Sequence, residues 1–221
     1  MRINVNLAFY YFNAGYLACQ IGYRVWYTAH TMKIVLHICC GVCAAGVAER
    51  LTSEGHQVRG LFYNPNIHPV EEYERRREVA QAVAQESGFS LAVLSHTPEE
   101  WFKTTSSLEK EPEGGRRCEV CFRLRLKKTR DYMLAHGWDA FTTTLTVGPQ
   151  KSADGINRVG REVGGDSFLV RDFKKKGGFQ RTMELAKKWS LYRQHYCGCI
   201  YSLRETDIKR LADKRICGAV I

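Results

Sequence analysis

Short apolar runs alternate with longer amphipathic segments along the chain from residue 32 onward. Runs rich in β-branched and aromatic residues predict strands over residues 34–38, 58–63, 91–94, 141–145 and 168–170. Apolar residues at helical spacing predict helices over residues 44–54, 69–87, 121–136, 151–163, 180–189 and 202–214, and one more that begins at residue 98. Gly55 and Gly88 directly follow two of these helices, and Pro69 stands in a first turn, which supports the boundaries.

Strands that alternate with helices predict an α/β fold, in which a parallel sheet carries helices on both faces. We expect a single α/β domain over residues 32–221, with its site beyond the carboxyl ends of the strands. Residues 1–31 differ, because they are rich in Tyr and Phe and carry only Arg2 and Arg24 as charges. We interpret them as an atypical N-terminal extension. No apolar run is long enough to predict a membrane span.

Seven of the nine cysteines fall into three tight groups that lie far apart in the sequence. The groups are Cys39, Cys40 and Cys43; Cys118 and Cys121; and Cys197 and Cys199. The first group follows a predicted strand, so we expect it at the edge of the sheet where sites form. Thiolates suit zinc or iron–sulfur clusters, and clustered cysteines without a secretion signal favour a reducing, cytoplasmic setting. The pattern predicts a metal or redox centre built from three segments.

The spacing of the cysteines leaves more than one kind of centre open. The two CxxC pairs, at residues 40–43 and 118–121, could form one four-thiolate site, although a zinc ribbon has a much shorter gap between its pairs. The CxxxCxxC pattern of radical S-adenosylmethionine enzymes fails, because Gly46 stands at its last position. Cys197 and Cys199, one residue apart, could bind a second metal or form a reducible disulfide.

The charge of the chain suggests a polyanionic partner, since the formal net charge is +10 and the pI is near 9.2. Basic segments occupy residues 75–77, 116–117, 123–130 and 174–178. A solvated basic surface would explain each of them alone, whereas a phosphate backbone would explain them together. Asp172, which follows the last predicted strand, or Asp154 could complete a metal's ligand shell or act as an acid.

Six segments carry a family resemblance: HICCGVC at 37–43, FYNPNIHP at 62–69, RCEVCFRLR at 117–125, TTTL at 142–145, DFKKKGG at 172–178 and YRQHYCGC at 192–199. Together, and in this order, they resemble the cobalamin-independent epoxyqueuosine reductases, the QueH family. The resemblance runs from residue 32 to about residue 204. The first segment departs from the family's pattern, because Gly41 and Val42 stand where Ala-Pro is common.

The resemblance implies a cytoplasmic enzyme that reduces the epoxide of epoxyqueuosine, at the wobble position of the tRNA anticodon, in the last step of queuosine formation. It implies a Rossmann-like fold related to adenine-nucleotide α-hydrolases. It also implies a 4Fe-4S cluster held by Cys39, Cys40, Cys118 and Cys121. Cys197 and Cys199 would be a redox-active pair or, with Cys43, ligands of an additional mononuclear iron. Asp172 is a candidate proton donor.

Substrate binding is expected from aromatic and basic residues of the same segments. They are Tyr63, Asn64, His68, Arg123, Arg125, Lys174, Lys175, Lys176, Tyr192 and Tyr196. The expected partners are tRNA and an electron donor such as ferredoxin or flavodoxin, with no membrane. We expect no cobalamin and no ATP, since cysteines occupy the place of a phosphate loop. Two alternatives are a zinc-stabilised RNA-binding module without catalysis and a general thiol oxidoreductase.

Overall fold

The computed structural model describes residues 31–207 of the chain. Within them one parallel sheet contains the strands β1 (Lys33–His37), β2 (Gln57–Phe62), β3 (Ser90–Val93) and β4 (Ala140–Thr143). The strand order is β3-β2-β1-β4, so the sheet grows outward from β1 in both directions. Leu36 of β1 pairs with Gly60 on one side and Thr142 on the other.

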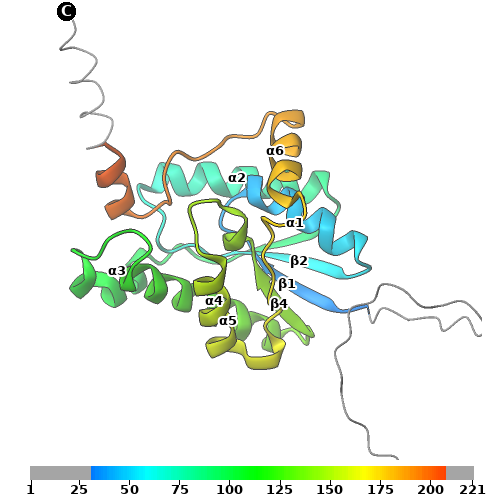
Figure 1. The fold of residues 1–221 in the computed structure, drawn as a ribbon, viewed down its shortest axis with the longest axis horizontal. Coiled ribbons are helices and arrows are strands. Elements are labelled where there is room, and N and C mark those ends of the chain that lie inside the picture. The colour runs from blue at the N-terminus through cyan, green and yellow to red at the C-terminus, as the bar shows by residue number, and fades with distance from the viewer. Residues whose placement is uncertain (1–30, 208–221) are drawn as a thin grey trace, which may run out of the picture.

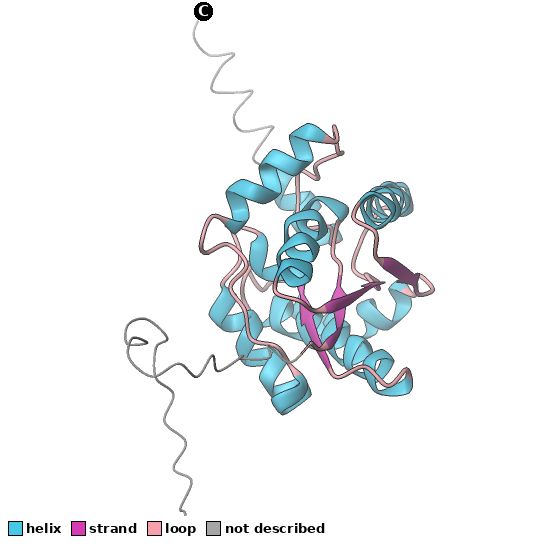
Figure 2. Cartoon of the chain, turned by 90° about the vertical axis from the view of Figure 1, so that its right-hand side faces the viewer, coloured by secondary structure: helices cyan, strands magenta, loops and turns pink. Residues whose placement is uncertain are grey.

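Helices cover both faces of this sheet (Figure 1). On one face pack α1 (Gly41–Ser53), α2 (Val70–Glu86) and α6 (Gly178–Lys188), and on the other α4 (Arg116–Ala135) and α5 (Ala153–Gly164). α3 (Pro98–Thr105) lies against α4, and short 3-10 helices occupy Ser106–Leu108, Thr144–Val147 and Gly165–Ser167. Residues 200–207 are helical up to the last described residue. Figure 2 shows the strands enclosed between helices.

Successive residues of β1 belong to two different apolar cores. Ile34 and Leu36 pack with residues of α1, α2 and α6, whereas Val35 packs with Leu126 of α4 and Val159 of α5. A parallel sheet is covered on both faces, so its strands are continuous apolar runs rather than alternating ones. The doubly covered sheet confirms the α/β fold predicted from the sequence.

Two elements differ from the predictions. The expected strand over residues 168–170 is reduced to a single bridge between Phe168 and Phe141, because the carbonyl of Leu169 accepts from the side chain of Thr142 (2.9 Å) rather than from the backbone of β4. Helix α4 begins at Arg116 rather than at residue 121, because Gly115 takes the extended conformation of an N-cap. Both cysteines of the second group therefore lie in the first two turns of α4.

Two predictions concern residues outside the described part of the chain. The N-terminal extension and the end of the helix predicted over residues 202–214 fall within residues 1–30 and 208–221. Between residues 31 and 207, none of the helices combines the length and the apolar character that crossing a membrane requires.

Candidate metal and redox centre

The first cysteine group lies where β1 ends and α1 begins, next to β4. Cys40 is the N-cap of α1, and the Sγ atoms of Cys39, Cys40 and Cys43 all lie within 4.8 Å of one another. The backbone N–H of Cys39 donates to Thr144 Oγ1 (3.1 Å), and that hydroxyl donates to Cys39 Sγ (3.3 Å). The site thus occupies the crevice where the strand order reverses, the usual place for a ligand in a doubly wound sheet.

One proton arrangement is favoured among these three thiols. Hydrogen bonds from the thiols of Cys40 and Cys43, and then from Thr144, hold the pKa of Cys39 well below its usual value. Donating to Cys39 raises the pKa of Cys40 to about 12 and also raises the pKa of Cys43. The group therefore presents one thiolate, and the N-terminus of α1 favours that negative charge.

His37 is buried beneath Cys39 at the end of β1. Its Nε2 lies 3.3 Å from the carbonyl oxygen of Tyr63, and its Nδ1 lies 2.9 Å from Thr143 Oγ1. A carbonyl only accepts, so Nε2 carries the proton. Burial, and then the nearby charge of Arg125, lower the pKa of His37 to about 4. The ring is therefore neutral and anchors the end of the strand.

The second and third cysteine groups meet in one buried cluster. Cys121 of α4 and Cys199 pack with Trp101. Cys118 Sγ accepts from the Gly114 N–H (3.2 Å) and Cys199 Sγ from the Ser202 N–H (3.4 Å). Burial is the largest cause that raises the pKa of Cys118 to about 11 and that of Cys199 to about 12. With no metal ion bound, the thiols of Cys118 and Cys199 are therefore protonated at neutral pH.

Two cations, Lys151 and Arg125, lie among the three groups. Lys151 Nζ lies 3.4 Å from Cys197 Sγ, and negative charge at Cys197 raises the pKa of the lysine, with a smaller contribution from Cys39. Arg125 is only 2% exposed. Its burial alone would lower its pKa, but the thiols of Cys121, Cys197 and Cys39 together raise it. The two side chains can therefore balance negative charge at the sulfur atoms.

Only one of these two cations was placed in the site from the sequence. Arg125 was expected to contact RNA phosphates, and in this structure its guanidinium is buried and lies near the cysteines. Lys151 was not singled out as a site residue. Its position just beyond the carboxyl end of β4 is the signal that could have identified it.

Two residues expected to bind substrate, Asn64 and Tyr63, make internal contacts in this structure. Asn64 is buried and donates from Nδ2 to the carbonyl of Ile38 (2.8 Å). Tyr63 is buried and donates to Glu100 Oε2 (2.5 Å). His68 is partly buried and packs against Trp101, and its burial lowers its pKa. These contacts hold the loop after β2 in place.

The aromatic segment before the third cysteine group is attached to α2 and to the loop that precedes it. The hydroxyl of Tyr192 donates to Glu72 Oε2 (2.8 Å), and that of Tyr196 donates to the carbonyl of His68. Gln194 Nε2 lies 3.3 Å from Cys40 Sγ, which connects this segment to the first cysteine group. The structure thus brings all three groups to one edge of the sheet.

Asp172 lies in the lysine-rich turn and is bound there. Its Oδ1 accepts from the backbone N–H of Lys174 (3.1 Å), and the ammonium groups of Lys174 and Lys175 lie within 4.0 Å of its carboxylate. Lys174 Nζ also donates to the carbonyl of Lys151 (3.0 Å). Lys175 and Lys176 are exposed, and Arg123 is ion-paired with Glu162 on the surface. These contacts give Asp172 the role of closing the turn.

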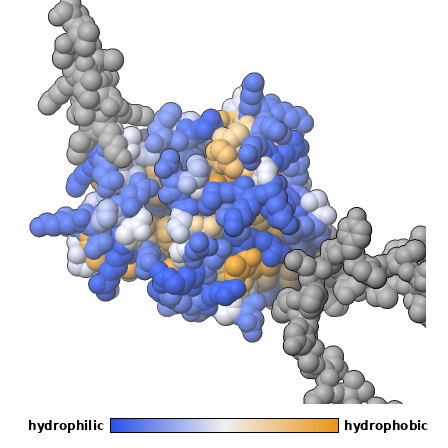
Figure 3. All heavy atoms as spheres, viewed as in Figure 1, coloured by the Kyte–Doolittle hydropathy of each residue, from blue (hydrophilic) through white to orange (hydrophobic). Residues whose placement is uncertain are grey.

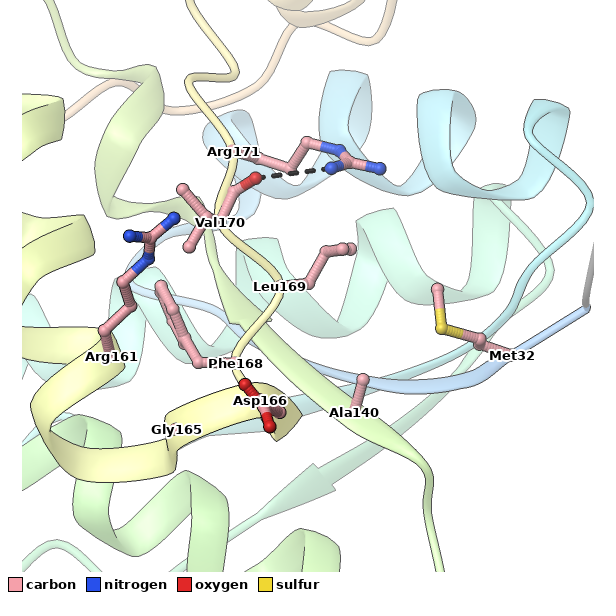
Figure 4. Close-up of a pocket in the computed structure, with 9 residues that line it drawn as sticks. All are labelled: Met32, Ala140, Arg161, Gly165, Asp166, Phe168, Leu169, Val170 and Arg171. Atoms are coloured by element: carbon pink, nitrogen blue, oxygen red, sulfur yellow. Dashed lines mark hydrogen bonds between the residues drawn. The ribbon is translucent and has the colours of Figure 1, made fainter. Parts of the chain in front are cut away.

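A cavity lies at the opposite edge of the sheet, and none of these cysteines lines it. Its volume is about 550 Å³, and Met32 and Ala140 at the amino ends of β1 and β4 line it (Figure 4). Its other lining residues are Arg161, Gly165, Asp166, Phe168, Leu169, Val170 and Arg171. The seven cysteines between residues 31 and 207 are all free thiols.

Comparisons with known proteins show the family of the chain. A family model described as "Epoxyqueuosine reductase QueH" matches residues 34–205. The epoxyqueuosine reductase QueH of Streptococcus pyogenes is 37% identical over an alignment of 192 residues, which covers 83% of this chain and 75% of the relative. That of Haemophilus influenzae is 36% identical over an alignment of 179 residues, which covers 79% of this chain and 73% of the relative.

A solved structure supports the fold. The U34-tRNA thiolase NcsA from Methanococcus maripaludis superposes with a TM-score of 0.51 and 14% identity, covering 84% of this chain and 67% of that one. This likeness agrees with the Rossmann-like, adenine-nucleotide α-hydrolase-like architecture predicted from the sequence. From the match over residues 34–205 and the identity to these relatives, the chain belongs to the epoxyqueuosine reductase QueH family.

Proposed function

We propose that the three cysteine groups form the site at which this chain reduces the epoxide of epoxyqueuosine in tRNA to the alkene of queuosine. The oxidoreductase activity follows from membership of the family. The observation that carries the proposed site is the convergence of three distant cysteine groups around Lys151 and Arg125. The reaction consumes two electrons and two protons and releases the epoxide oxygen as water.

The donor set fits an iron–sulfur cluster. Three Sγ atoms lie within 4.8 Å of one another, and Cys39 is already favoured as a thiolate. Cys39, Cys40, Cys118 and Cys121 would hold a 4Fe-4S cluster, with Cys43 beside the first two as a further ligand for this cluster or an additional iron. The structurally similar NcsA carries a [4Fe-4S] cluster, which supports this assignment. Such a cluster supplies single electrons, which would come from a donor such as ferredoxin or flavodoxin.

Cys197 and Cys199 are proposed as the redox-active pair of this site. As two thiols they hold the two electrons that the reaction needs, and they release two protons when they form a disulfide. Lys151 keeps a proton at Nζ beside Cys197 Sγ. The carboxylate of Asp172 is bound by its own turn, so Lys151 is the better-placed candidate to protonate the leaving oxygen.

The exposed lysines of the turn after Asp172 are proposed to contact tRNA phosphates. Lys175 is 78% exposed, and Lys176 is exposed beside it. Hydrophilic side chains cover most of the face shown in Figure 3, which fits binding to a polar polymer. Lys174 joins the same turn to the carbonyl of Lys151, so RNA bound at these lysines would lie near the cysteines.

Serine substitution of the proposed pair tests the function. Cys197→Ser and Cys199→Ser should each abolish reduction of epoxyqueuosine in tRNA while leaving iron and sulfide content unchanged. Cys217→Ser, a change at a cysteine that stands apart from the three groups in the sequence, is the matched control and should keep full activity. Full activity in both test variants would show that the pair is not part of the reaction.

A further inference from the structure

Three consecutive arginines of α2 lie in very different surroundings. The side chains of Arg75 and Arg77 are 53% and 37% exposed, whereas that of Arg76 is 2% exposed. In the sequence all three form one basic segment, which was expected to bind phosphates together with the other basic segments. A buried guanidinium is costly unless its N–H groups are bonded, so the partners of Arg76 indicate what it does.

The partners of Arg76 are the backbone of the third cysteine group and one carboxylate. Its Nη1 donates to the carbonyl of Cys197 (3.0 Å) and its Nη2 to the carbonyl of Tyr196 (3.1 Å). Its Nε donates to Glu72 Oε1 (2.7 Å), and its guanidinium lies 5.4 Å from the ring centroid of Tyr196. All three nitrogens are therefore used, and two of them hold successive carbonyls of one loop.

The carboxylate of Glu72 fixes the orientation of the Arg76 guanidinium by accepting from its Nε. This carboxylate is 6% exposed and also accepts from the hydroxyl of Tyr192, five residues before Cys197. The segment is thus attached to α2 at three points, through Tyr192, Tyr196 and Cys197. Planar groups that bind several acceptors at once give geometric specificity beyond their energy.

Gly198 makes the close approach of Arg76 possible. Its φ is +123°, a conformation that residues with a side chain rarely adopt, and a Cβ there would lie 3.0 Å from Arg76 Nη1. The other side of the loop is also bonded, because His68 N–H donates to the carbonyl of Gly198 (2.8 Å) and Cys197 N–H donates to Ser202 Oγ (3.1 Å). The backbone between the two cysteines therefore has one defined conformation.

We propose that Arg76 is a positioning residue that holds Cys197 and Cys199 in their dithiol conformation. Both thiols are free in this conformation, and the bonds from Arg76 are made to it. A disulfide needs its own Cβ–Sγ–Sγ–Cβ geometry, and bonds that hold the carbonyls of Tyr196 and Cys197 oppose the backbone change that reaching it requires, so Arg76 makes disulfide formation less favourable. The proposal relies on the proposed function only for the redox role of the pair.

The dithiol–disulfide equilibrium of the pair tests the proposal directly. Full-length protein, purified without oxygen, is equilibrated with mixtures of reduced and oxidised glutathione and quenched by alkylation. Oxidation transfers two electrons and two protons from the two thiols to one glutathione disulfide, giving one protein disulfide and two glutathione molecules. The tryptic peptide 194–204 contains both cysteines and no others, so mass spectrometry reads this pair alone.

Arg76→Gln should shift the equilibrium constant toward the disulfide about tenfold, which is about 30 mV for a two-electron couple. Arg77→Gln is the matched control and should leave the constant unchanged, because the side chain of Arg77 pairs with Glu74 and not with this segment. The proposal would be overturned if the equilibrium constant of Arg76→Gln lay within twofold of the wild-type constant or shifted toward the dithiol. It would also be overturned if the cysteine pair stayed reduced in both proteins at every ratio of reduced to oxidised glutathione.

Arg76→Lys keeps the positive charge but cannot bond two carbonyls and Glu72 in the same fork. Arg76→Lys should shift the equilibrium constant toward the disulfide by at least threefold. If Arg76→Gln fails to fold, Arg76→Lys is the variant that tests the proposal, and an equilibrium constant equal to that of the wild type would then overturn it. Because the assay contains no epoxyqueuosine, failure of the proposed function would not affect its outcome.

Discussion

Gly41 directly follows the first two cysteines, and adding one methyl group there should destabilise the protein. A Cβ on Gly41 would lie 2.5 Å from the carbonyl oxygen of Val79 and 2.6 Å from its Cγ1. Backbone of α2 would have to move, because these distances are far below van der Waals contact. Overpacking of this kind costs about 1–3 kcal/mol, and the better helix propensity of Ala offsets at most about 1 kcal/mol.

We therefore expect Gly41→Ala to lower the free energy of unfolding by about 1–2 kcal/mol, and the Tm by about 2–8 °C. The assay is thermal unfolding followed by circular dichroism, with guanidinium unfolding as a second measurement. The chain departs from its family's Ala-Pro at this point, so the result also shows whether Gly41 is required by the close approach of α1 to α2.

Gly155 provides a matched control in the first turn of α5. A Cβ there would meet only the side chain of Ser152, with Oγ at 3.5 Å and Cβ at 3.7 Å, which are ordinary contacts. Gly155→Ala should be neutral or should stabilise the protein by up to about 1 kcal/mol. If Gly41→Ala is as stable as wild type while Gly155→Ala behaves as expected, the steric argument about α1 and α2 is wrong.

Three further predictions follow from the charges of the site. Lowering the pH from 7 to 5 should reduce the free energy of unfolding of the metal-free protein by about 2 kcal/mol through His37. The pKa of His37 is about 4 in the folded protein and 6.5 in the unfolded chain, so the unfolded chain binds more protons over this range. The variant His37→Gln should lose this part of the pH dependence. In metal-free protein at pH 7, iodoacetamide should modify Cys39 before Cys40, because only Cys39 has a lowered pKa. Tandem mass spectrometry measures the two rates of modification, and equal rates would contradict the assignment of the thiolate to Cys39. Replacing Lys175 and Lys176 with alanine should weaken tRNA binding and reduce its salt slope by about 1–2, and an unchanged slope would remove them from the interface.

The sequence predicted the sheet and the place of the first cysteine group well, because both depend on local patterns. The apolar run that became β1 was buried on both faces, and the turn after it had to lie at the carboxyl edge. The strand expected over residues 168–170 is only a single bridge, because a short apolar run does not show whether its backbone will bond a neighbouring strand or a side chain such as that of Thr142.

The direction of individual side chains was harder to predict than their position. Arg123 and Arg125 lie in one basic stretch, yet two residues along a helix point to nearly opposite sides, so one is exposed and the other faces the cysteines. Asp172 stands at a site-like position, but a short acidic side chain readily bonds its own turn, as it does here with Lys174. Which groups meet is decided by tertiary packing.

The most direct test of the account is the conversion of epoxyqueuosine-containing tRNA by protein purified without oxygen and supplied with a reductant. The tRNA is digested, and its nucleosides are identified by mass spectrometry. We expect queuosine, the product with one oxygen atom fewer, from protein that contains iron and sulfide, and none from protein that contains only zinc. Unchanged epoxyqueuosine with the iron–sulfur protein, or equal conversion by the zinc form, would contradict the proposed site.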